Sequence, residues 1–148
     1  MLQPTPARHS PRIWCAAIML IPALWLVRQQ PSPPSLLGRW HGRSICDRAP
    51  GNEACHDEEV IYHVAPSPQH PGRVRLDADK VVNGAIIPMG ALEFDFDKAT
   101  DTWISEFRNA RVDVLWRLHV TGSRLDGRLE DVPSRRLRRR VSAVRDSV

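Results

Sequence analysis

Apolar and polar residues alternate with a period of two along much of this chain. In 74–78, 92–97, 112–120 and 124–130, every second residue is apolar or glycine. A period of two gives a β-strand one buried face and one wet face. Turn signals such as Asn83-Gly84 and Thr121-Gly122 separate these runs at intervals of about ten residues. The chain is therefore predicted to be all-β, an antiparallel meander of seven or eight strands.

The pattern is less regular at the two ends of the meander. Segments 37–46, 59–65 and 103–107 fit further strands. At the C-terminus, 135–141 fits a closing strand, while Ser134 offers the cap of an alternative helix with Leu137, Val141 and Val144 on one stripe. We prefer the strand, because the first strand of a meander needs a last partner.

Closure into a barrel is the expected arrangement of these strands, because it leaves no exposed sheet edge. Gly38, Gly42, Gly90 and Gly127 lie inside predicted strands. Glycine weakens a strand unless a bend or a close approach requires it. Small, strongly coiled barrels have such places, so we predict a small closed or nearly closed barrel, with a two-sheet sandwich as the alternative.

Residues 13–27 form an uncharged apolar run between two arginines, Arg8 and Arg12, and a Pro/Ser-rich segment. This order is typical of an export signal. As a helix the run spans roughly 22 Å, against about 30 Å of bilayer hydrocarbon, and it lacks a following small-x-small cleavage site. A cleaved signal and an uncleaved signal-anchor both remain open, and both place the following domain outside the cytoplasm. The predicted organisation is a signal or anchor helix over 1–30, a linker over 31–36, a barrel over 37–144 and a disordered tail over 145–148.

Two cysteines, Cys46 and Cys55, follow the apolar run. In an exported chain an even pair predicts a disulfide. In the chain-entropy model, closing so small a loop contributes roughly 2–3 kcal/mol. A zinc site would need a second Cys/His pair at ligand spacing, which the sequence lacks.

The formal net charge of +4 conceals an uneven distribution. Residues 36–131 carry 12 Lys/Arg against 16 Asp/Glu, a net charge of −4. Much of the basic excess lies in the arginine strip, residues 135–140. An acidic exported domain argues against nucleic acid as the partner class. The strip is interpreted as a solvated last strand or as a contact for anionic lipid.

Gly38-Arg39-Trp40, at the start of the first predicted strand, resembles the Gly-x-Trp signature of the lipocalins. The resemblance implies a barrel in which an arginine of the last strand covers the tryptophan at the closed end. The arginine strip supplies the candidates, and Trp40 with Arg138 is the predicted stacking pair.

Two further resemblances are broader. The chain is similar to small periplasmic metalloprotease-inhibitor barrels in size, in its Gly-x-Trp strand, in its disulfide and in its basic end. It also resembles uncharacterised bacterial secreted proteins through Trp40-His41-Gly42, Asp57-Glu58, Ala78-Asp79-Lys80 and Pro88-Met89-Gly90. This last resemblance implies no activity.

The segment 78–90 departs most from the alternation. Lys80 interrupts it, and 86–90 is apolar in both phases with Pro88 inside the strand. Proline in a strand indicates an edge or a bulge, and bulges are common near binding sites. Lys80, Ile87 and Met89 are therefore candidate ligand or partner contacts, and a hairpin packed in the core is the alternative.

The sequence contains no constellation that predicts catalysis. Its histidines are scattered, Asp95 and Asp97 share an exposed strand face, and no serine has a nucleophile-elbow context. We expect no catalytic residue, no metal and no cofactor. The predicted function is an exported cell-envelope barrel that binds an apolar ligand or an envelope partner. The alternatives are a protease-inhibitor barrel and a structural envelope protein tethered to the membrane by residues 13–27.

Overall fold

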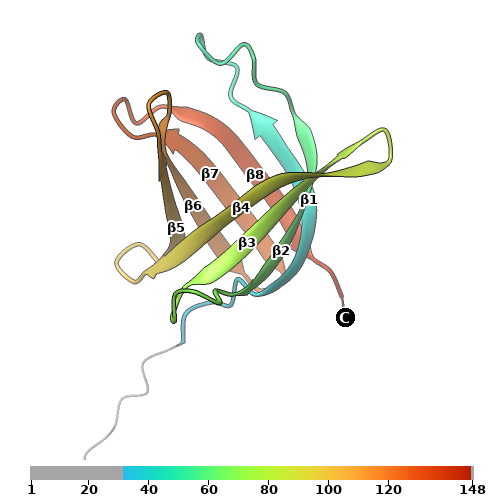
Figure 1. Cartoon of the computed structure of the whole chain (residues 1–148), viewed down its shortest axis with the longest axis vertical. Helices are drawn as coiled ribbons and strands as arrows, with labels where there is room; N and C mark the ends of the chain where they lie inside the picture. Colours follow the sequence, from blue (N-terminus) through green and yellow to red (C-terminus); the bar gives the residue numbers. More distant parts are fainter. Residues whose placement is uncertain (1–31, 148) are drawn as a thin grey trace, which may run out of the picture. The chain divides into compact units, whose positions relative to one another are not determined.

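The computed structural model describes residues 32–147, and in them the chain forms eight antiparallel strands (Figure 1). The strands are β1 (Gly38–Cys46), β2 (Glu58–Pro66), β3 (Val74–Val82), β4 (Ala85–Asp97), β5 (Thr102–Arg108), β6 (Asp113–Thr121), β7 (Arg124–Asp131) and β8 (Leu137–Arg145). Each strand pairs with the next along the chain, and β8 pairs with β1, so the sheet closes into a barrel. The predicted meander and barrel are confirmed, and the sandwich alternative is wrong.

Within residues 32–147 there is no helix long and apolar enough to cross a membrane. The apolar run 13–27 and the predicted helix over 1–30 lie outside the described residues.

The alternation of the sequence sorts side chains between the inside and the outside of the barrel. On β6, Val114, Leu118 and Val120 are buried, whereas His119 between them is exposed. The same phase buries Val74 and Leu76 on β3. Because all eight strands contribute one apolar face, the core fills the inside of the barrel.

The seam between the first and last strands closes the barrel. β8 pairs with β1 from Trp40↔Arg145 to Cys46↔Arg139, so the closing-strand interpretation is confirmed and the helix alternative is wrong. The strand starts at Leu137 rather than at residue 135, and it includes Arg145, which the sequence analysis assigned to the tail. Gly42 makes the close approach possible, because a Cβ there would lie 2.1 Å from the Ser142 carbonyl oxygen.

The up-and-down order places the connections at two ends. The disulfide end has the connections 47–57, 83–84, 109–112 and 132–136, which join odd-numbered strands to the strands that follow them. The tryptophan end has the other connections and the segment 32–37 that leads into β1 (Figure 1).

Aromatic and aliphatic side chains fill the tryptophan end. Trp40 and Leu36 are both 0% exposed, and the Trp40 Nε1–H donates to the Leu36 carbonyl oxygen at 2.9 Å. The Trp103 Nε1–H donates to the Pro34 carbonyl oxygen at 3.0 Å. Leu36, predicted to lie in the linker, therefore belongs to the core at this end, because it is an apolar side chain that the barrel buries.

The arginine that covers Trp40 is Arg145, whose Cζ lies 4.3 Å from the ring centroid. The predicted partner Arg138 is wrong. Arg138 lies near the disulfide end and donates to Asp131 at 3.0 Å. The cause is register, because Arg145 stands directly opposite Trp40 in the β1–β8 pairing, seven residues beyond Arg138.

The strands β4 and β5 pair near the tryptophan end and lose their pairing towards the disulfide end. They pair from Asp95↔Ile104 to Asp97↔Thr102, whereas the rest of β4 pairs with β3 alone. The β3–β4 register shifts between Ala78 and Asp79, which leaves Met89 as the extra residue of a bulge. The prediction of an edge or a bulge at Pro88 is confirmed, since the bulge lies at the next residue and this part of β4 has no pairing with β5.

Candidate functional site

A cavity of about 410 Å³ occupies the inside of the barrel towards the disulfide end. All eight strands contribute to its lining. Its deep side consists of Leu76, Phe94 and Leu118, which are at most 4% exposed and belong to the main core. The cavity reaches solvent beside Met89 and Phe107, which line it and are 42% and 44% exposed. The parting of β4 and β5 thus opens one side of an otherwise closed barrel.

One wall of the cavity is apolar. It comes from β4, β5, β6 and β7, and its members are Met89, Phe107, Val114, Trp116 and Leu129. Concave sites of this size with mostly hydrophobic and aromatic walls are typical of small-molecule binding.

The facing wall is polar and comes from three adjacent strands. Ser44 on β1 stands opposite Glu58 on β2 in the strand register. Tyr62 follows on β2, and Arg139 lies on β8, on the other side of β1. Ser44 and Tyr62 are 3% and 6% exposed. Burial raises the pKa of Tyr62, so its hydroxyl keeps its proton at neutral pH and can donate a hydrogen bond.

Three charged side chains meet at this wall. Glu58 pairs with Arg139 at 2.9 Å between Oε2 and Nη2, and both side chains are 18% exposed. The Lys80 ammonium lies 3.5 Å from the other carboxylate oxygen, Oε1 of Glu58. Arg139 also donates from Nη2 to the His56 carbonyl oxygen at 2.6 Å. Glu58 is therefore held between two cations at the rim of an apolar cavity.

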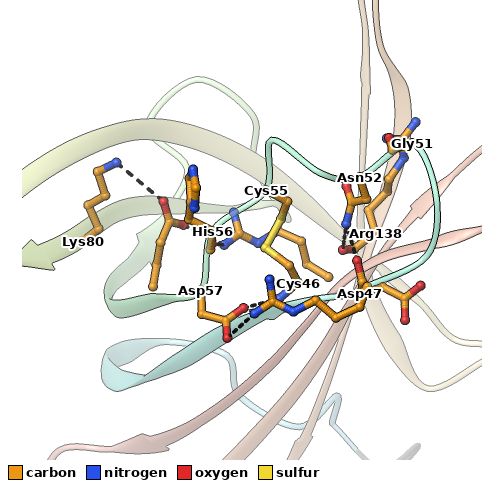
Figure 2. Close-up of a disulfide and its surroundings, with 12 residues drawn as sticks. Cys46, Asp47, Gly51, Asn52, Cys55, His56, Asp57, Lys80 and Arg138 are labelled. Carbon is orange, nitrogen blue, oxygen red and sulfur yellow. Dashed lines mark hydrogen bonds and ion pairs between the residues drawn. A yellow bond between two sulfur atoms is a disulfide. The ribbon is translucent and has the colours of Figure 1, made fainter.

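The disulfide holds the connection that carries His56 and leads into Glu58. The Cys46–Cys55 bond predicted from the sequence is present, with a Cα–Cα distance of 5.9 Å (Figure 2). The Cys46 amide donates to Asp57 at 2.9 Å. That hydrogen bond, with the Arg48 guanidinium, holds the pKa of Asp57 below its usual range. The turn after β1 thus positions the charged wall.

A second contact fixes the far side of the same connection. The Asn52 side-chain amide donates to the carbonyl oxygens of Asp47 and Arg138, at 2.7 and 2.9 Å (Figure 2). Arg138 belongs to β8, so the loop is tied to both strands that flank the seam.

The structure brings two of the three candidate contacts to the cavity. Met89 lines it directly, and Lys80 reaches it through Glu58. Ile87 pairs with Lys80 across the strands, is 39% exposed and does not line the cavity. The hairpin is not packed in the core, since Ile86 is 57% exposed. The core-packed alternative is therefore wrong, because this part of β4 pairs with β3 alone and has no partner strand on its other side.

Sequence reasoning placed Lys80 near a binding site but did not place Glu58 and Arg139 there, although a signal was present. Arg139 lies in the inward phase of β8 with Val141 and Ala143. Glu58 lies in the inward phase of β2 with Val60 and Tyr62. A charged residue in the apolar phase of a strand marks a place where the interior is not simply core.

The chain matches no protein family model, and no curated protein is significantly similar to it in sequence. In residues 32–147, no three His, Cys, Asp or Glu side chains are grouped so that they could hold a metal ion. The arrangement offers shape, an apolar wall and a charged wall, which are the elements of a binding site.

Proposed function

We propose that this protein is a small binding barrel that holds an apolar ligand in the cavity at its disulfide end. The observation that supports this proposal most directly is the cavity of about 410 Å³, whose apolar wall includes Met89, Phe107, Val114 and Trp116. Barrels of about eight strands are wide enough either to be filled by side chains or to hold one small ligand. Here side chains fill the tryptophan end and leave the other end hollow.

The proposed setting is the cell envelope. A disulfide persists in oxidising compartments and is rare in the cytoplasm. The Cys46–Cys55 bond and the export-like order of residues 8–35 both support this setting.

The proposal includes a relationship to the lipocalins. It is supported by the Gly38-Arg39-Trp40 start of β1 and by the last-strand arginine, Arg145, stacked on Trp40. The apolar cavity agrees with that relationship.

The test is the binding of a neutral fluorescent lipid, cis-parinaric acid methyl ester, to the full chain. The ester should bind the unaltered protein, and Ala78→Phe should abolish binding, because Ala78 lines the cavity and the added ring fills it. Ala65→Phe is the matched control, since it adds the same ring at an exposed position of β2. The apolar run 13–27 is common to all three proteins and cancels in the comparison. Equal binding by all three would overturn the proposal.

A further inference from the structure

The polarity of the cavity indicates which kind of apolar ligand fits it. The polar lining, Ser44, Glu58, Tyr62 and Arg139, lies on β8, β1 and β2. The aromatic lining near the opening lies on β5 and β6. A purely hydrocarbon ligand would shield this polar lining from water without offering it a hydrogen bond, and the loss of hydration without a new partner is costly. The shape therefore suits a molecule with a polar head and an apolar tail.

The charge of the wall selects the sign of that head. Lys80 and Arg139 carry two positive charges against the one negative charge of Glu58. The neighbouring carboxylate, Asp57, is matched by Arg48, at 2.8 Å. One positive charge is left beside the cavity, and ionic attraction is stronger there than in water because the surroundings are mostly apolar.

Arg139 has hydrogen-bond donors that its contacts in the structure do not use. Its contacts with Glu58 and with the His56 carbonyl both use Nη2. Its Nε–H is buried and has no partner among the described residues. A guanidinium has five donors in a planar fork that matches a carboxylate, and Nη1, which makes no hydrogen bond within residues 32–147, is left for an anion.

A buried ion pair is also a poor means of stabilising a fold. Removing both charges from water costs about as much as their attraction returns, and an apolar pair of similar volume often serves better. Glu58 and Arg139 occupy inward positions that their strands otherwise give to apolar residues. A role in binding explains why charges stand there.

We propose that the ligand is a monocarboxylate amphiphile of the fatty-acid type. Its carboxylate lies against Arg139 and Lys80, with the Tyr62 and Ser44 hydroxyls as further donors. Its tail lies along Trp116 and Met89 towards the opening between β4 and β5. This inference rests on the proposed function and names the ligand class of the same cavity.

The test compares two probes that share one tail, cis-parinaric acid and its methyl ester, on the full chain at neutral pH. The acid should bind at least about tenfold more tightly than the ester, the usual effect of hydrogen bonds to a charged group. Arg139→Met should remove that preference, so that the ratio of the acid and ester affinities falls to about one. Arg140→Met is the matched control, because Arg140 is the next residue of β8 and is exposed.

A second variant keeps the test decisive if Arg139→Met does not fold. Glu58→Gln removes the carboxylate that competes with the ligand for both cations, so it should tighten acid binding and raise the preference for the acid over the ester. Acid and ester that bind equally to the unaltered protein would overturn the inference while the binding barrel stands. Weaker acid binding by Glu58→Gln would also overturn it. If neither probe binds, both proposals fall.

Discussion

Removing the disulfide should destabilise the barrel by an amount that its loop length sets. The two cysteines are separated by 9 positions in the sequence. In the chain-entropy model, a cross-link that closes such a loop lowers the entropy of the unfolded chain and raises its free energy by about 2.6 kcal/mol at 25 °C. The folded loop has other ties, including the Asn52 side chain to the backbone of Arg138, so its native position should persist without the bond. The double variant Cys46→Ala/Cys55→Ala should therefore fold and be less stable.

Equilibrium urea unfolding measures this loss. A domain of this size has a denaturant slope of about 1–2 kcal/mol per molar, so the midpoint should fall by roughly 1–3 M. Reduced wild-type protein should behave like the double variant, which controls for the two substituted side chains. A stability change under about 0.5 kcal/mol, or two free thiols in the natively located protein, would refute the reasoning. A loss above about 5 kcal/mol would show that the bond holds native contacts rather than restricting the unfolded chain.

Three further predictions concern the seam and the ends of the barrel. Arg145→Met removes the cation over the Trp40 ring and should lower the free energy of unfolding in urea by about 1–3 kcal/mol. Arg140→Met, at an exposed position of the same strand, should lower it by less than about 0.5 kcal/mol. Gly42→Ala drives a Cβ into the backbone of β8 and should lower the free energy of unfolding by about 3 kcal/mol or more. Gly127→Ala first meets the end of a leucine side chain and should lower it less. Equal losses would contradict the seam geometry. Folding lowers the pKa of Asp57, so the stabilising effect of its carboxylate should be present above about pH 4 and fade as the pH falls through the folded-state pKa. In a plot of the free energy of unfolding against pH, Asp57→Asn should reduce the fall on the acid side. An unchanged fall would count against the hydrogen bond.

The barrel was predictable because its main signals are local. A period of two needs no knowledge of distant residues. The turn at Asn83-Gly84 lies between two strands as predicted, and the turn predicted at Thr121-Gly122 lies one residue later, at Gly122-Ser123. Asn83 and Gly84 have φ of 51° and 79°, as a two-residue hairpin turn requires. The disulfide was also predictable, since the only cysteines that follow the apolar run are Cys46 and Cys55, which allow one pairing.

The Trp40 partner was not predictable, because it depends on register between the two ends of the chain. A shift of the last strand by a few residues changes which arginine stands opposite Trp40. The alternation of β8 is weak where arginines fill both phases, so the sequence did not fix where the strand starts or ends.

The open side of the cavity was not predictable either. The apolar segment 86–90 has the composition of a core strand, yet Ile86 and Met89 are exposed. Its exposure follows from how β4 pairs, with β5 near Asp95 and with β3 elsewhere. The charged wall could have been predicted from the sequence, because Glu58 and Arg139 occupy positions that the alternation assigns to the inward, apolar face of their strands.

Entry of a ligand into the barrel is the central requirement of the proposed function. The most direct measurement is methyl NMR of the full chain titrated with cis-parinaric acid methyl ester. Chemical-shift changes should concentrate at methyl groups inside the cavity, those of Val60, Val114 and Leu129, and should spare Val144, which is exposed on the outer face of β8. Changes confined to the exposed hairpin at Ile86 and Ile87, or no saturable change, would contradict it.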